Sequence, residues 1–212
     1  TSLSKDSVNK DHLRKQSHLD LAAASQNNEI DGRFYYEPML SGHPHKTEKW
    51  PVKLGEKSMD YPIWISSMTG GSAQAGAVNK ILAKAAKKFR LGMGLGSCRI
   101  ILEDETYFED FNLRPILGEE VPLYANLGIA QIEQLIDSKK VALIDRLIKK
   151  LDADGLIVHV NPLQEWLQPE GDIIKRSPID TILELKNELD IPLIVKEVGQ
   201  GYGKESMRQL LG

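Results

Sequence analysis

The chain has 212 residues, of which 41% are hydrophobic and 27% charged, a composition typical of a folded globular domain rather than a disordered one. Its 27 lysines and arginines are nearly balanced by 30 aspartates and glutamates, and a net charge of −3 argues against a general nucleic-acid-binding or membrane surface. The single cysteine, Cys98, excludes an intramolecular disulfide, and no apolar run approaches the ~20 residues of a membrane span, so we expect a cytoplasmic protein.

The first sixty residues are expected to form an extension of helix and loop, packed against a main domain that spans 61–212. The stretch 6–24 has a helical pattern. The stretch 43–59 mixes proline, glycine and both charges, which is typical of a loop with a short strand. We therefore do not expect this extension to form a separate domain.

Five short apolar segments recur through the rest of the chain, with 29 to 37 residues between successive starts. Each segment is rich in β-branched residues and nearly continuous rather than alternating. Such runs are typical of strands that are buried on both faces, as in a parallel sheet. The predicted strands lie at 62–66, 91–95, 122–127, 155–160 and 192–198.

Helical patterns lie between the predicted strands. Over 72–89 the apolar residues recur at i, i+3, i+4 and i+7, which predicts an amphipathic helix. A similar pattern over 129–151 is expected to break near Ser138. Ser177, followed by proline and then an acid, predicts the start of a helix that runs to about residue 189. Alternating strands and helices predict an α/β fold, either a doubly wound sheet or a (β/α) barrel.

Polar residues follow each predicted strand, at the edge where enzymes built on parallel sheets carry their active sites. One polar strand end is common, but five successive ones are hard to explain by packing alone. The sequence therefore predicts one shared polar site at this edge. Its members follow the strands in the order Thr69; Ser97 and Arg99; Asn126; His159, Asn161, Gln164 and Glu165; and Lys196.

Two of these residues indicate the kind of ligand. Lys196 lies within an apolar run, where an unpaired ammonium is costly. It therefore makes either a structural salt bridge, for example to Glu197, or a contact with an electron-rich cofactor ring or a phosphate. Glu165 is the only acid in its cluster, which argues against a transition-metal site with several protein ligands. One carboxylate together with substrate phosphate oxygens is the usual way in which Mg²⁺ is held.

Several sequence strings resemble those of the type 2, flavin-dependent isopentenyl-diphosphate isomerases, and together they cover nearly the whole chain. HVNPLQE followed by PEGD is the most specific piece, whereas MTGG and the lysine strand are shared more widely among FMN barrels. The family's Ser-x-Arg motif usually has Gln in the middle, where this chain has Cys98. The strings are RKQSHL at 14–19, MTGG at 68–71, GSCR at 96–99, ANLG at 125–128, HVNPLQE at 159–165, PEGD at 169–172 and VKEVG at 195–199.

The resemblance implies an isomerase of isoprenoid biosynthesis that interconverts isopentenyl diphosphate and dimethylallyl diphosphate without net redox change. It implies reduced FMN and Mg²⁺ as cofactors, NADPH as the reductant, and a homo-oligomer, either a tetramer or an octamer. Gln164 is the implied catalytic residue, which orients or relays a proton beside the allyl unit, and Glu165 is the implied Mg²⁺ ligand. The implied FMN-binding residues are Ser67, Met68, Thr69, Gly70, Ser97, Asn126 and Lys196. The implied substrate-binding residues are Arg14, Lys15, Ser97, Arg99, His159, Asn161 and Gln164.

The family's fold is a (β/α)8 TIM barrel, of which this chain is expected to contain about five βα units and the extension. Five strands do not close such a barrel, and both edges of the sheet would expose unpaired backbone. We therefore expect a truncated chain. Two alternatives to the isomerase stay open: another FMN-dependent barrel oxidoreductase, of the 2-hydroxy-acid oxidase or dehydrogenase type, and a catalytically inactive fragment.

Overall fold

The computed structural model describes residues 39–40, 42, 45, 47–67, 73–102 and 104–211. The helix predicted over 6–24 lies outside these residues, and so do five of the candidate site residues. Their roles stay predictions. These five are Arg14, Lys15, Met68, Thr69 and Gly70.

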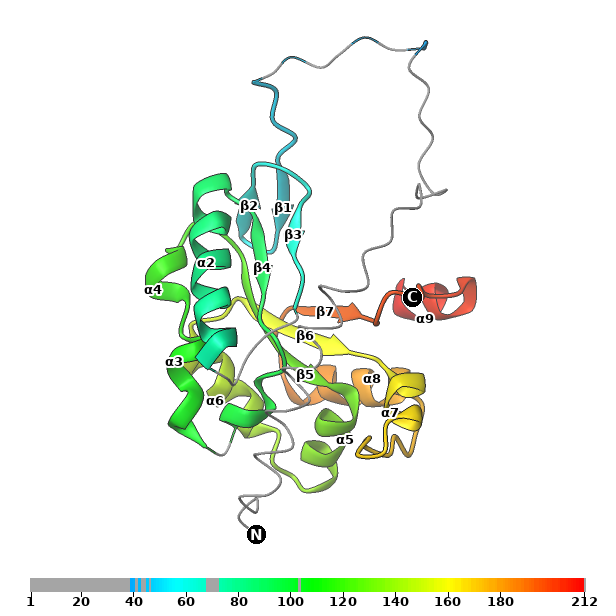
Figure 1. Ribbon diagram of the computed structural model, residues 1–212. Coiled ribbons are helices and arrows are strands. Elements are labelled where there is room, and N and C mark those ends of the chain that lie inside the picture. The colour runs from blue at the N-terminus through cyan, green and yellow to red at the C-terminus, as the bar shows by residue number, and fades with distance from the viewer. Residues whose placement is uncertain are drawn as a thin grey trace.

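A sheet of five parallel strands forms the centre of the described part of the chain (Figure 1). The strands lie side by side in chain order. All five strand predictions are confirmed, and each strand falls within its predicted segment or extends one residue beyond it. The strands are β3 (Trp64–Ile65), β4 (Gly92–Gly94), β5 (Leu123–Gly128), β6 (Gly155–His159) and β7 (Leu193–Lys196).

Helices connect the successive strands and pack against one face of the sheet (Figure 1). The helices predicted over 72–89, over 129–151 and from Ser177 are all confirmed, including the break near Ser138. Two 3-10 helices follow β4, at Cys98–Ile101 and Glu105–Tyr107. The α-helices are α2 (Ala73–Phe89), α3 (Phe108–Phe111), α4 (Arg114–Leu117), α5 (Ile129–Asp137), α6 (Ala142–Leu151), α7 (Pro162–Leu167), α8 (Pro178–Glu188) and α9 (Lys204–Leu211).

Local side-chain and backbone chemistry explains where α5 ends and where α8 begins. The Ser138 hydroxyl donates to the carbonyl oxygen of Gln134 at 2.7 Å, and Lys139 adopts the left-handed region with φ 56°, which ends α5. At the start of α8, the Ser177 Oγ accepts the backbone N–H of Asp180 at 3.3 Å. These side chains act as the stop and start signals that the sequence indicated.

The strand order decides between the two architectures that the sequence left open. A doubly wound sheet reverses its strand order at a switch point and carries helices on both faces. Here the order β3-β4-β5-β6-β7 never reverses, so right-handed crossovers place the connecting helices on one face. The fold is therefore α/β, with five parallel strands that curl into a half-barrel, as in a partial TIM barrel (Figure 1).

Successive residues of each strand face opposite sides of the half-barrel. On the concave side, the rings of Trp64 and Tyr124 meet edge to face, with their centroids 5.7 Å apart. Asn126 lies two residues after Tyr124 and so faces the same side, nearer the carboxyl end of β5. The opposite, helix-facing set is fully buried and contributes to the main core through Met93, Leu123, Ala125, Leu127, Leu156 and Val158.

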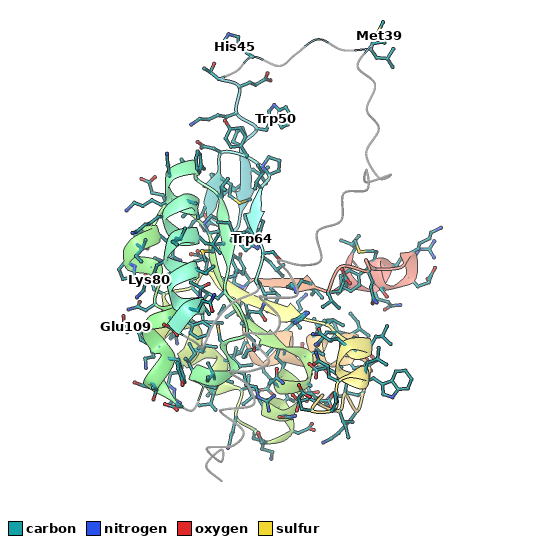
Figure 2. All side chains as sticks on the ribbon, in the orientation of Figure 1. Met39, His45, Trp50, Trp64, Lys80 and Glu109 are labelled. Atoms are coloured by element: carbon teal, nitrogen blue, oxygen red, sulfur yellow. The ribbon has the colours of Figure 1, made fainter. Side chains whose placement is uncertain are left out.

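An antiparallel hairpin precedes the sheet, where the sequence predicted a loop with one short strand. It packs at the amino end of the sheet, since Lys57 Nζ lies 2.6 Å from the Oδ1 of Asp154, the residue just before β6. Trp64 lies on the sheet, whereas Trp50 lies on the exposed segment that leads away from it (Figure 2). The hairpin strands are β1 (Val52–Leu54) and β2 (Lys57–Met59).

Arg114 binds together the segments at this amino end, and its side chain is only 5% exposed. Its Nε donates to the Asp152 carbonyl at 2.8 Å, one Nη donates to the Gly118 carbonyl at 2.9 Å, and the other donates to Asp154 Oδ2 at 2.9 Å. Asp154 Oδ2 also accepts the backbone N–H of Leu123 at 2.8 Å, at the start of β5. This end of the half-barrel is therefore tied by charged hydrogen bonds, and the opposite end carries the candidate site.

Candidate active site

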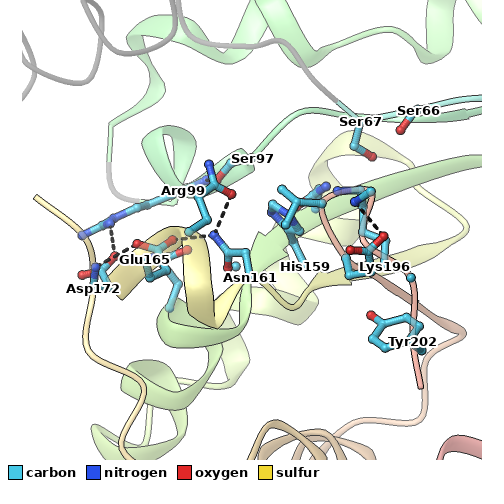
Figure 3. A pocket seen from close by; sticks show the side chains of 18 of the residues that line it. Ser66, Ser67, Ser97, Arg99, His159, Asn161, Glu165, Asp172, Lys196 and Tyr202 are labelled. Carbon is cyan, nitrogen blue, oxygen red and sulfur yellow. Dashed lines mark hydrogen bonds and ion pairs between the residues drawn. The ribbon is translucent and has the colours of Figure 1, made fainter. Parts of the chain in front are cut away.

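A pocket of about 800 Å³ opens at the carboxyl ends of the strands (Figure 3). Every candidate site residue that falls within the described part of the chain lines it. The structure thus brings together residues from five separate strand ends, although their individual roles stay predictions. These residues are Ser67, Ser97, Arg99, Asn126, His159, Asn161, Gln164, Glu165 and Lys196.

The register of the sheet accounts for this convergence. Gly128 on β5 pairs with His159 on β6, and His159 pairs in turn with Lys196 on β7. Residues in register at the ends of parallel strands lie at one level, so the imidazole and the ammonium project from the same rim. Asn126 is one row deeper, in register with Ile157. The pocket therefore has an amide one row below the imidazole and the ammonium.

One side of the pocket holds polar atoms that have no hydrogen-bond partner among the described residues. They are the Oγ of Ser67 and the Oδ1 of Asn126, both buried. Since unpaired buried polar atoms are costly, these two atoms are suited to a polar ligand. Both belong to the set that the resemblance assigns to FMN, a group that carries hydrogen-bond donors and acceptors of its own.

Lys196 adds an ammonium group to the same side. Burial lowers the pKa of Lys196, and the Glu197 carboxylate partly opposes this shift. Among the described residues, Lys196 forms no ion pair with Glu197 or any other carboxylate, so the structural salt bridge is not the alternative that the described residues support. Glu197 instead accepts the backbone N–H groups of Gly199 at 2.6 Å and Gln200 at 2.7 Å. Lys196 is thus available for an electron-rich ligand.

The other side of the pocket is a hydrogen-bonded cluster around Glu165, which is 8% exposed. Asn161 Nδ2 donates to Glu165 Oε1 at 2.7 Å and lies 3.3 Å from Gln164 Oε1. The backbone N–H of Asp172 donates to Glu165 Oε2 at 2.8 Å. This return of the chain needs Gly171, where a Cβ would lie 1.7 Å from the Glu165 carbonyl oxygen.

Arg99 forms an ion pair on this side of the pocket. Its Nη1 lies 2.6 Å from Asp172 Oδ2, and the Nε2 of Gln131 donates to the same oxygen at 2.6 Å (Figure 3). Neither Asp172 nor Gln131 is among the site residues that the sequence predicts. The signals were present, because Asp172 ends the PEGD string and Gln131 is a polar residue in the apolar run that follows β5.

Tyr202 is a third residue of the pocket that the sequence analysis missed. Its hydroxyl is buried with no hydrogen-bond partner among the described residues. Burial, and to a lesser degree the Glu197 carboxylate, raise the pKa of Tyr202 to about 12. The phenol therefore stays protonated and can donate at neutral pH. The available signal was an aromatic residue flanked by two glycines, in the loop that follows the last predicted strand.

The described residues hold no group of three or more His, Cys, Asp or Glu side chains arranged to bind a metal ion. Glu165 accepts one hydrogen bond on each carboxylate oxygen, which leaves a second lone pair on each. The carboxylate therefore fits a cation that takes its remaining ligands from a bound phosphate. Among the described residues, no helix has the length and apolar character that crossing a membrane requires.

Comparison with known proteins reveals clear relatives, although no protein-family model matches the chain. The chain is 36% identical over 210 residues to an isopentenyl-diphosphate delta-isomerase of Rickettsia felis, and 35% identical over 209 residues to that of Rickettsia prowazekii; both matches cover 96% of the chain. A protein of the same name from Pseudescherichia vulneris is 42% identical over 156 residues, which are 73% of this chain and 44% of that protein. The chain spans about three fifths of the length of the two Rickettsia proteins, 59% and 60%. It is therefore a homologue of proteins that carry this name.

Proposed function

We propose that the chain carries the site of a type 2, FMN-dependent isopentenyl-diphosphate isomerase, which interconverts isopentenyl diphosphate and dimethylallyl diphosphate. The names of its relatives support the isomerisation. The observation that carries the flavin-dependent assignment is the group of Ser67, Asn126 and Lys196, which line one side of the pocket without a described protein partner. NADPH as reductant and a homo-oligomeric assembly are part of the same proposal.

The unpaired groups suit the pyrimidine edge of a flavin ring. The Asn126 Oδ1 can accept a ring N–H, and the Lys196 ammonium can donate to the side of the ring that becomes electron-rich on reduction. An anionic partner also offsets the desolvation that lowers the Lys196 pKa. We assign Ser67, Ser97, Asn126 and Lys196 to FMN, together with the predicted residues Met68, Thr69 and Gly70 that lie outside the described residues.

The cluster around Glu165 suits a diphosphate and its cation. Arg99 lines the pocket and commits one terminal nitrogen to Asp172; since a guanidinium has five N–H donors, others remain available to a ligand. His159 and Asn161 line the same wall. In this proposal Glu165 binds Mg²⁺ in combination with diphosphate oxygens. The predicted basic pair Arg14 and Lys15, which the structure does not describe, completes the anion site.

The reaction needs a proton added to an unactivated alkene and another removed two bonds away. Reduced FMN, when bound, supplies an electron-rich surface and acid–base groups in contact with the hydrocarbon. The protein holds the diphosphate at one end of the pocket and so places the alkene at the other. Gln164 is an amide, too weak an acid to protonate an alkene. Its Oε1 accepts from Asn161, which directs the amide and leaves its N–H group to orient or relay.

The direct test adds isopentenyl diphosphate to the purified chain with FMN, Mg²⁺ and NADPH under anaerobic conditions. We expect dimethylallyl diphosphate to form, detected by proton NMR, with far less NADPH consumed than product formed. Stoichiometric hydride transfer to or from a 2-hydroxy acid, with no isomerised product, would instead support the oxidoreductase alternative. A colourless protein that takes up no FMN would support the inactive fragment.

A further inference from the structure

Asp172 contacts both the basic and the acidic members of the diphosphate side of the pocket. Its Oδ2 accepts from Arg99 Nη1 and from Gln131 Nε2, each at 2.6 Å. Its backbone N–H donates to Glu165 Oε2 at 2.8 Å. Gln134 makes only a long contact of 3.4 Å to the other carboxylate oxygen. One residue therefore connects segments that follow β4, β5 and β6.

The neighbours of Asp172 are arranged to keep its carboxylate in place. Gln131 is only 8% exposed, and it reaches Asp172 across the space left by Gly128, where a Cβ would lie 2.4 Å from Gln131 Oε1. Asp172 itself lies between α7 and α8 in a segment without helix or strand. Its position thus depends on side-chain contacts and on the close approach of Gly171 to Glu165, not on a regular backbone ladder.

Arg99 is the residue of this group whose side chain gains most from being ordered by a neighbouring residue before a ligand binds. Its side chain is 39% exposed, and a long side chain at such exposure loses rotamer freedom when it binds a ligand. Asp172 holds one terminal nitrogen of Arg99 without any ligand, and the other N–H groups of this pocket-lining guanidinium remain available to one. Pre-ordering of this kind strengthens binding because the ordering cost is met in the folded protein.

We propose that Asp172 is a positioning residue that orients Arg99 toward the diphosphate and couples it to Glu165. This inference rests on the proposed function, since it requires Arg99 to contact a diphosphate. The role depends on hydrogen-bond geometry more than on charge. An asparagine can present its amide oxygen to both Arg99 and Gln131, because both bind the same carboxylate oxygen.

The test measures binding of inorganic pyrophosphate with Mg²⁺ to the purified full chain by isothermal titration calorimetry. We expect Asp172→Ala to weaken pyrophosphate binding about tenfold, on the scale of one charge-assisted hydrogen bond. Asp172→Asn should stay within about threefold of the unaltered chain. Gln134→Ala is the matched control, because it removes an exposed amide that makes only the long contact to Asp172, and it should leave binding unchanged. FMN uptake should be the same in all of these variants.

A double-mutant cycle separates positioning from a general loss of structure. In an Arg99→Ala background, the further change Asp172→Ala should have no additional effect on pyrophosphate binding. In the active enzyme, Asp172→Ala should raise KM for isopentenyl diphosphate with little change in kcat. If Asp172→Ala does not fold, Asp172→Ser, which is polar but too short to reach Arg99, replaces it in the cycle.

Several results would overturn the inference. One is pyrophosphate binding by Asp172→Ala that is unchanged or tighter. Another is tighter binding by Asp172→Asn, which would mean that the carboxylate competes with the ligand. A third is additive effects of the two substitutions in the double-mutant cycle. A chain that binds no pyrophosphate at all would also overturn it. Failure of the proposed function looks different, because pyrophosphate then binds with the expected dependence on Asp172 but no dimethylallyl diphosphate forms.

Discussion

His159 on β6 and Lys196 on β7 stand directly opposite each other in parallel register, at the rim of the half-barrel. Both side chains line the pocket. This pairing brings a cation from one strand beside an imidazole from the next, with Asn126 one row deeper on β5. The polar site is therefore set by backbone hydrogen bonds of the sheet, which are among the most rigid contacts in a fold.

Lys196→Met is expected to weaken FMN binding at least tenfold. Loss of a hydrogen bond to a charged group costs about 1.5–3 kcal/mol, and each 1.4 kcal/mol is about a tenfold change in affinity. The ligand-free protein should be no less stable, because a half-buried ammonium without a described carboxylate partner is replaced by an apolar chain. FMN titration followed by absorbance, together with urea unfolding, measures both effects. Lys204→Met, at an exposed position of α9, is the control; equal FMN affinity in the two variants would refute the assignment.

Gln164→Ala is expected to keep FMN bound while turnover falls about 10²–10⁴-fold, the usual scale for loss of a group that moves a proton. Truncation removes the acceptor that Asn161 contacts at 3.3 Å, and it also removes the amide that would orient or relay. Flavin absorbance and dimethylallyl diphosphate production are measured on the same sample. Full turnover in Gln164→Ala with reduced FMN bound would show that the assigned role is wrong.

The Tyr202 phenol is expected to titrate near pH 12, because burial and the Glu197 carboxylate raise its pKa to about 12. The unfolded chain releases this proton near the ordinary value of about 10. The folded state thus binds more protons between these values, so the stability due to this group falls as the pH rises from 10 to 12. Absorbance of phenolate is compared between the unaltered chain and Tyr202→Phe. A difference that develops fully near pH 10 would contradict the expectation.

Arg114→Ala is expected to destabilise the protein by about 3–5 kcal/mol, because it leaves the buried side of Asp154 and three backbone carbonyls without their donor. Urea unfolding measures the loss. Lys149→Ala removes an exposed ion pair with Asp145 and should cost only about 0.5 kcal/mol. FMN affinity of the folded fraction should stay unchanged, since Arg114 lies at the amino end of the sheet; a selective loss of FMN would contradict this separation of roles.

The elements that the sequence predicted best are those with strong local signals. The apolar runs at 122–127 and 155–160 became β5 and β6 almost residue for residue, and Ser177 begins α8 as expected. Local sequence signals could not decide between a barrel and a doubly wound sheet. Both contain the same βα units, and only the spatial order of the strands distinguishes them.

The candidate site was predicted through its strand ends and missed where it depends on long-range contacts. Asn126, His159 and Lys196 each close an apolar run, so their position on the rim could be inferred. Asp172 and Gln131 belong to segments without that signal, and their importance arises from contacts to Arg99 over 73 positions and to each other over 41. The periodicity of a sequence does not predict contacts between residues so far apart along the chain.

The sequential order of the strands has a consequence for how the chain is made. Each new strand pairs with the one synthesised just before it, so every step of sheet growth closes a loop of one βα unit rather than a long one. The nascent polypeptide can therefore add one strand and its following helix at a time to the sheet as it leaves the ribosome. A translational pause between successive βα units would leave a sheet in which every completed strand already lies beside its sequence neighbour.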